Sequence, residues 1–492
     1  MKDKIAEIKS YFYGSNVKFT LLYTLCAIFI GLNCYLVYRE IYLLLLLPVL
    51  IVILYLYFYS LDKILLLITL LTPLAINISQ FEFGVSVSLP TEPLMFGVLI
   101  MFILKLLFDN TFDKQLWKHP LTIIIIIQLC WIFVTSLASQ IPLVSFKFLL
   151  SRLWFVIPFY IFGVHLFKRI QNIRLFIWLY AIGLVIVIFY TTYQHSLWAF
   201  DEEAGHWVMD PFYNDHTAYG AILSMYIPFF FAFSFSKVYS RTTQFFAFVV
   251  LVILFIALYL SFCRAAWVSL AMALIIFLIV IFKIKFKWIA VTTVILGILF
   301  YIFQFQILDR LEKNKQGSSA NFLEHVRSIS NISTDNSNLE RINRWQSALR
   351  MFEERPVFGF GPGTYQFSYA PYQRSGEKTL ISTNAGDRGN AHSEYIGPLA
   401  EQGLPALLII VALVITMIIT AMKVYRNSKD REVRILCFAA LLGLMTYFIH
   451  GIMNNFLDTD KASVPVWGFM AIIVALDIYS LKKPEVTSIE LE

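Results

Sequence analysis

The sequence predicts an all-α polytopic membrane protein with about 14 (12–14) transmembrane helices. Of its 492 residues, 59% are hydrophobic and 14% are charged, whereas soluble proteins average roughly 45–50% apolar and about 25% charged residues. Several stretches of about 20 residues carry no charge, which is the length that a helix needs to cross a bilayer. A soluble domain is therefore excluded, the lipid bilayer is an expected partner, and nothing in the sequence implies nucleic acid.

The apolar runs divide the chain into expected spans and one long loop. Residues 1–140 are expected to be N-terminal transmembrane helices. Residues 141–305 are expected to be the transmembrane helices that carry two arginines of the candidate site, Arg152 and Arg264. Residues 306–392 form the long loop, and residues 393–492 the C-terminal helices. The expected spans lie near 19–38, 41–59, 64–80, 91–108, 120–139, 148–166, 173–193, 217–236, 243–262, 265–282, 286–305, 394–422, 433–455 and 463–481.

The distribution of positive charge predicts the orientation. With a cytoplasmic N-terminus, 23 Lys and Arg residues lie in cytoplasmic segments and 5 in the short outer segments. Because Lys and Arg accumulate in cytoplasmic loops, we expect both termini in the cytoplasm and the long loop outside. The five cysteines lie in or beside apolar stretches without metal-ligand or redox spacing, so we expect free thiols.

The long loop is expected to contain a short amphipathic helix. Ser337 and Glu340 have the spacing of a capping box, and Pro356 ends the helical pattern. An apolar face at helical spacing predicts docking on the outer rim of the bundle, with the glycine-rich turn Gly359–Gly363 folding the chain back over it. The residues of this face are Leu339, Ile342, Trp345, Leu349 and Phe352.

Two arginines at the outer membrane boundary are hard to explain as solvated surface. Arg264 joins two apolar runs through a very short connection, and Arg152 lies about one turn inside an expected span. An arginine at this depth is costly unless it is paired or used. The structural alternatives are an interfacial, snorkelling side chain for Arg264 and a helix-to-helix ion pair for Arg152.

His392 closes the long loop directly before an expected span. A histidine near its unperturbed pKa can accept a proton at neutral pH, which suits general base catalysis at a lipid–water boundary. The alternative is a helix cap or a surface residue. The eight histidines show no ligand spacing that predicts a metal site.

Five short motifs resemble the O-antigen ligase and Wzy-type polymerase superfamily of polytopic bacterial glycosyltransferases. Each is weak alone, but their order and expected side match the family. They are Ser261–Trp267 (SFCRAAW), Arg341–Gln346 (RINRWQ), Arg355–Gly363 (RPVFGFGPG), Asn390–Tyr395 (NAHSEY) and Glu401–Gly403 (EQG).

The resemblance covers about residues 140–460. It implies a GT-C-like membrane enzyme of the bacterial inner membrane that acts on the periplasmic face. Its donor would be a glycan on a polyprenyl (undecaprenyl) diphosphate carrier, and its acceptor would be a hydroxyl group. The glycan would be transferred with inversion and without nucleotide sugar, cofactor or metal. Lipid A core is the favoured acceptor; a Wzy-type polymerase and a ligase that O-glycosylates proteins remain open.

The resemblance also assigns roles to residues. His392 would take the proton from the acceptor hydroxyl, while Arg264 and Arg152 would hold the diphosphate and offset its developing charge. Arg341, four residues before a tryptophan, would contact diphosphate or sugar; its alternative is a solvated helix face shared with Arg344.

Further candidates flank these residues. Asp215, His216 and Tyr219 could line the sugar site, with interfacial anchoring and helix capping as the alternative. Asn390 belongs to the histidine motif. Glu394 could orient the imidazole or bind sugar hydroxyls, although the helix dipole alone favours a first-turn glutamate.

The competing functional class is a transporter or flippase of lipid-linked glycans or small molecules, because many helices with intramembrane arginines also suit transport. A scaffold is a third possibility. The sequence lacks a matching pair of broken helices in two halves, which disfavours transport. A polymerase needs two diphosphate sites, and only one set of membrane-level arginines, Arg152 and Arg264, is evident, which favours the ligase.

Overall fold

The computed structural model describes residues 15–81, 85–108, 113–285, 287, 336–379, 382 and 389–481. Contacts divide the chain into two units, residues 1–64 and 65–492. The first unit holds α2 (Ser15–Tyr38), the short 3₁₀ helix η1 (Leu43–Leu46) and α3 (Leu47–Tyr59).

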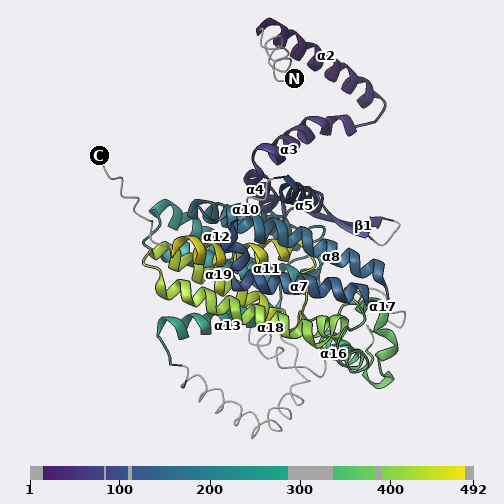
Figure 1. Cartoon of the computed structure of the whole chain (residues 1–492), viewed down its shortest axis with the longest axis vertical. Coiled ribbons are helices and arrows are strands. Elements are labelled where there is room, and N and C mark those ends of the chain that lie inside the picture. Colours follow the sequence, from purple (N-terminus) through teal and green to yellow (C-terminus); the bar gives the residue numbers. More distant parts are fainter. Residues whose placement is uncertain are drawn as a thin grey trace. The chain divides into compact units, whose positions relative to one another are not determined.

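The second unit is a helical bundle with the described elements of the long loop at one end (Figure 1). Its transmembrane part comprises α5 (Thr91–Phe108), α7 (Pro120–Leu137), α8 (Pro142–Val156) with η2 (Ile157–Phe162) and α9 (Gly163–Leu166), α10 (Ile170–Ser196), α11 (His216–Phe235), α12 (Arg241–Leu260), α13 (Arg264–Ile281), α18 (Ile396–Asn427), α19 (Arg431–His450) and α20 (Asp460–Ala475) with η6 (Leu476–Ser480). Shorter helices are α6 (Lys114–Lys118), η3 (Ala204–His206), α16 (Asn336–Glu354), α17 (Tyr365–Ser368), η4 (Ala370–Tyr372) and η5 (Ser375–Glu377).

Among the described residues, 11 helices are long and apolar enough to cross a membrane, which confirms a mostly helical polytopic protein. The expected count of 14 is not confirmed by the described residues. The segment expected at 41–59 is a shorter apolar helix, Leu44–Tyr59, and the span expected at 286–305 lies outside the described residues. All five cysteines are free, as expected.

The span expected at 64–80 is wrong. Helix α4 (Leu61–Leu71) ends two residues before Pro73, which cannot donate a backbone hydrogen bond. An antiparallel hairpin of β1 (Ile76–Phe81) and β2 (Val85–Leu89) follows, with Ile76 opposite Leu89. The alternation of β-branched and polar residues in both segments is a strand signal that overall hydropathy obscures. The chain is therefore not purely α-helical.

The core is centred on α20, whose residues are all buried and which packs against α8, η2 and α19. Helices α11 and α19 approach closely, because a Cβ at Gly443 would lie 2.6 Å from the Met225 carbonyl oxygen. The start of α11 lies near the end of α19, because Asp215 and His216 both act electrostatically on His450, and the first residue of α13, Arg264, acts on His216.

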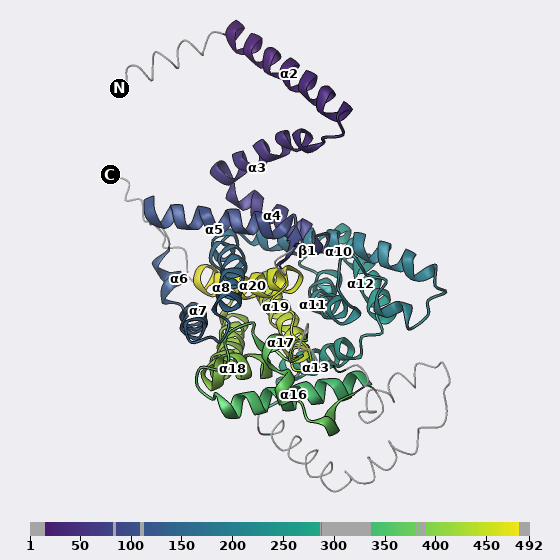
Figure 2. The same ribbon diagram turned by 90° about the vertical axis from the view of Figure 1, so that its right-hand side faces the viewer.

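The glycine-rich turn docks on the bundle as expected. The amide of Phe360 donates to the Ala400 carbonyl at 3.2 Å, and that of Gly361 donates to the Glu401 carbonyl at 2.8 Å. Gly361 has φ +114°, and a Cβ there would lie 2.0 Å from Ser139 Oγ, so only glycine fits. Figure 2 shows α16 lying across the end of the bundle at which α18 begins.

Candidate active site

Helix α16 forms as predicted, but it docks through the opposite face. Four of the five residues of its predicted apolar face are only partly buried, and the fifth, Leu349, is 43% exposed. The expectation that this apolar face packs on the bundle is therefore wrong. The buried face is mostly polar: Glu340, Asn343, Arg344, Ser347, Ala348 and Met351.

The polar face can be buried because its groups have partners. The Glu340 carboxylate accepts hydrogen bonds from Arg344 Nε at 2.8 Å, Thr379 Oγ1 at 3.0 Å and the Ser382 hydroxyl. Burial raises the pKa of Glu340, but the hydrogen bonds from Ser382 and Arg344 outweigh it and hold the pKa below its usual range. Glu340 thus binds neighbouring loop residues, and the side chain of Ser337, its expected capping partner, lies outside the described residues.

Arg344 links α16 to residues 389–394, the histidine segment that contains His392. It is buried, and its second contact is a 3.1 Å hydrogen bond from Nη1 to the carbonyl oxygen of Asn390. A side chain at Gly389 would collide with the guanidinium, at 1.8 Å from Nη1. The sequence suggested a solvated arginine here, and the signal that could have corrected this is the Glu340–Arg344 spacing of an i,i+4 ion pair.

His392 lies in a left-handed backbone conformation, φ 46°, with its amide bonded to Asn390 Oδ1 at 3.1 Å. Burial, followed by the positive charges of Arg344 and Arg341, lowers the pKa of His392 to about 4; Asp215 acts in the opposite direction. Within the described part of the chain its ring makes no hydrogen bond. The imidazole is therefore neutral at pH 7 and keeps a lone pair for a proton.

The residues at the start of α11 face the same region. Asp215 caps the helix by accepting from the amides of Thr217 and Ala218, both at 2.8 Å, so the capping alternative is observed. The ring of His216 stacks on that of His206 with centroids 4.2 Å apart. Tyr219 is buried against the ring of Tyr213, which makes it a packing residue of the bundle.

Arg264 is the first residue of α13 and is one-third exposed. Its guanidinium lies 3.9 Å from the Glu202 carboxylate of the α10–α11 loop. Arg264 and Arg341 both act electrostatically on His216, and Arg341 also acts on His392. The structure thus brings together Arg264, Arg341, His216 and His392, which come from four separate stretches of sequence.

Arg152 has a different environment. Its Nη2 forms a 2.7 Å ion pair with Asp458, and its Nη1 donates to the Leu457 carbonyl at 3.4 Å. Both contacts belong to the α19–α20 connection, so Arg152 forms an ion pair as the structural alternative expected, but with a loop residue and not with a second helix. Burial raises the pKa of Asp458, and the charge of Arg152 opposes this rise.

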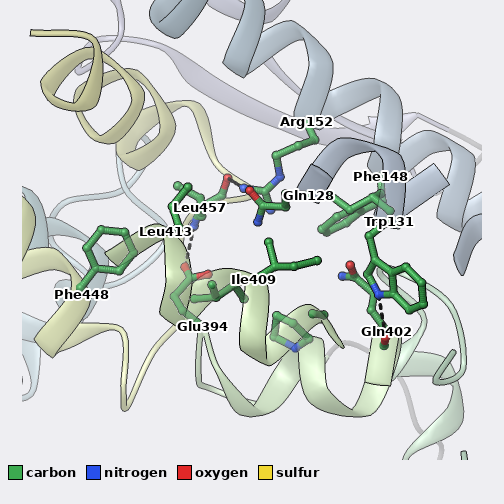
Figure 3. A pocket seen from close by; sticks show the side chains of 14 residues that line it. Gln128, Trp131, Phe148, Arg152, Glu394, Gln402, Ile409, Leu413, Phe448 and Leu457 are labelled. Atoms are coloured by element: carbon green, nitrogen blue, oxygen red, sulfur yellow. Dashed lines mark hydrogen bonds between the residues drawn. The ribbon is translucent and has the colours of Figure 1, made fainter. Parts of the chain in front are cut away.

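Arg152 lines a small pocket with Gln128 and Glu394 (Figure 3). The pocket has a volume of about 40 Å³, enough for roughly two or three waters. Glu394 does not orient His392. Its Oε1 accepts from the Tyr447 hydroxyl at 2.6 Å and the Leu457 amide at 2.9 Å, so it fixes the α19–α20 connection.

Metal ligands do not gather at this site: across the described ranges, no three His, Cys, Asp or Glu side chains are placed to hold an ion. What does gather is a neutral imidazole, two arginines and a carboxylate at one end of the bundle. Such a set can accept one proton and bind one anion.

Comparison with known proteins gives two findings. Residues 249–411 match the family model of the O-antigen ligase domain, Wzy_C. An uncharacterized protein of Haemophilus influenzae is 22% identical over 225 residues, which are 44% of this chain and 53% of that protein, so the chain spans about half the length of this relative. The resemblance to the O-antigen ligase and Wzy superfamily is thereby confirmed.

Proposed function

Since residues 249–411 match the O-antigen ligase domain, we propose that this membrane protein transfers a glycan from a polyprenyl diphosphate carrier to an acceptor hydroxyl. The observation that supports this most strongly is the neutral, partly buried His392 beside Arg341 and within the same set as Arg264. Such a transfer requires a base for the acceptor hydroxyl and a neighbouring site that binds the anionic leaving group.

In the proposed reaction, His392 accepts the proton of the acceptor hydroxyl as its oxygen attacks the anomeric carbon. The glycosidic bond to phosphate breaks on the opposite side, so the configuration inverts and the carrier diphosphate leaves with the bonding electrons. Arg264 and Arg341 hold this diphosphate and stabilise the negative charge that it gains. Neither nucleotide sugar nor metal takes part.

The depressed pKa of His392 has a role in this scheme. A free base with a pKa of about 4 is weak, but part of the depression comes from the positive charges of Arg344 and Arg341. A bound diphosphate offsets the charge of Arg341, so His392 becomes more basic when the donor is in place. The base is thus strengthened only in the loaded enzyme.

We assign Arg152 a structural role, because its guanidinium is buried and paired with Asp458. The diphosphate site is then Arg264 with Arg341, one site within the described part of the chain. A single carrier site favours a ligase acting on lipid A core over a polymerase. The site would face the periplasm from the bacterial inner membrane, with both termini in the cytoplasm.

The test uses purified protein in liposomes with a labelled polyprenyl-diphosphate glycan. We expect a covalent conjugate when lipid A core is added and little polymer from donor alone. Efficient chain growth from donor alone would replace the ligase by the polymerase. Movement of the label across the bilayer without any covalent transfer would refute the enzyme and support a transporter.

A further inference from the structure

His450, the last residue of α19, is a buried side chain that the proposed reaction does not yet use. It is 2% exposed and lies at the end of the bundle where α11 and α13 begin. The charges of Arg341 and Asp215 and the ring of His216 all act electrostatically on it. His450 therefore borders the same anion-binding region from a fifth element.

One hydrogen bond fixes which nitrogen of this ring carries the proton. The Asn454 side-chain nitrogen lies 3.0 Å from His450 Nε2. An amide NH₂ can only donate, so Nε2 accepts and, in the neutral ring, the proton is on Nδ1. Nδ1–H is then a hydrogen-bond donor.

This donor has no acceptor. Among the described residues, His450 Nδ1 is buried without a hydrogen-bond partner. A buried donor without a partner is unfavourable, and in native structures a water, an ion or a ligand supplies the missing partner. The neighbouring Arg341 indicates that this partner carries negative or strongly accepting oxygens.

We propose that His450 Nδ1–H donates a hydrogen bond to an oxygen of the lipid-linked donor, either a phosphate oxygen of the carrier or a hydroxyl oxygen of its first sugar. This inference rests on the proposed glycan transfer. It makes His450 a substrate-binding residue, while His392 remains the base, because the only free position of the His450 ring is a proton donor.

Two substitutions separate the two ring nitrogens. In His450→Asn the amide NH₂ lies near the former Nδ1, so the donor is kept and the contact with Asn454 is lost. In His450→Gln the amide lies near the former Nε2, so the contact with Asn454 is kept and the Nδ1 donor is lost. His195→Gln is the matched control, because His195 is also buried and bonds the Asp201 carbonyl through Nε2 at 2.7 Å.

The experiment measures binding of undecaprenyl diphosphate and of the glycan-bearing donor to each purified full-length variant. We expect His450→Gln to weaken binding about 10- to 100-fold, and His450→Asn and His195→Gln to stay within about threefold of wild type. Weakening for both ligands identifies a phosphate oxygen as the partner. Weakening for the glycan-bearing donor alone identifies a sugar hydroxyl.

Equal affinity of His450→Gln and wild type, or equal loss in both His450 variants, would overturn the inference and leave the proposed function standing. If wild type itself binds neither ligand, the proposed function and the inference both fail. Transfer rates at saturating donor give a further readout: His450→Gln should raise KM more than it lowers kcat.

Discussion

Arg344 is the residue whose loss should most clearly separate positioning from chemistry. Arg344→Met keeps much of the side-chain volume but removes the buried ion pair with Glu340 and the hydrogen bond to the Asn390 carbonyl. Breaking a buried pair from one side costs about 3–5 kcal/mol. Glu340 keeps its hydrogen bonds from Thr379 and Ser382, so we expect a smaller cost of about 2–3 kcal/mol.

This cost should appear locally, where Arg344 holds the histidine segment. The amide of Glu394, bonded to the Gly451 carbonyl at 2.8 Å, reports on that segment. We expect its hydrogen exchange to quicken about 30- to 100-fold in Arg344→Met and glycan transfer to fall about 10²-fold, since small displacements of a base have effects of this size. Donor binding should change less than transfer.

Arg350→Met is the matched control, because Arg350 lies on the same helix and pairs with Glu377 nearer the surface. It should cost at most about 1 kcal/mol and leave transfer near normal. The double variant Glu340→Gln with Arg344→Met should recover part of the stability, since no unpaired charge is left, but not the activity. Wild-type exchange at Glu394 and wild-type transfer in Arg344→Met would refute the positioning role.

Four further results are expected. Because His392 must be neutral to act, transfer should fall only as the pH drops through the pKa of His392. Arg341→Gln removes a charge that lowers this pKa, so it should move the acidic limb of the kcat/KM profile to higher pH. An unchanged acidic limb would show that Arg341 does not act on His392. Gly361→Ala should abolish activity or expression, because its Cβ meets Ser139 and its φ is +114°, and a fully active variant would contradict the docked turn. A cysteine at Glu353 should react with an impermeant maleimide from the periplasmic side, and the reverse labelling pattern would invert the orientation. A cysteine at Lys429 should react only from the cytoplasmic side, provided the charge distribution gives the topology.

The sequence predicted most of the helices well, because a long uncharged apolar run can hardly form anything other than a membrane-spanning helix. It failed at 64–80, because a mean hydropathy over this stretch does not register the helix end near Pro73 or the alternation of apolar and polar residues in the hairpin. It also failed for the docked face of α16. Amphipathicity identifies the apolar face, but a polar face can be the buried one when its groups are satisfied, as Glu340 and Arg344 are.

The site could be predicted only in part for a similar reason. His392, Arg264 and Arg341 could be proposed from the sequence because each belongs to a recognisable motif. Arg152 was grouped with Arg264 by its expected depth in the membrane, whereas its partner, Asp458, lies more than 300 residues away in the chain. His450 carries no local signal, because what marks it is an unsatisfied nitrogen that exists only once α19 is packed.

The most direct test of the proposed chemistry compares wild type with His392→Ala in two assays on the same purified protein: binding of the lipid-linked donor and covalent transfer to lipid A core. We expect unchanged donor binding, because His392 acts on the acceptor hydroxyl, and a transfer rate lower by about 10² to 10⁴. Transfer at the wild-type rate in His392→Ala would show that another group is the base and contradict the central assignment.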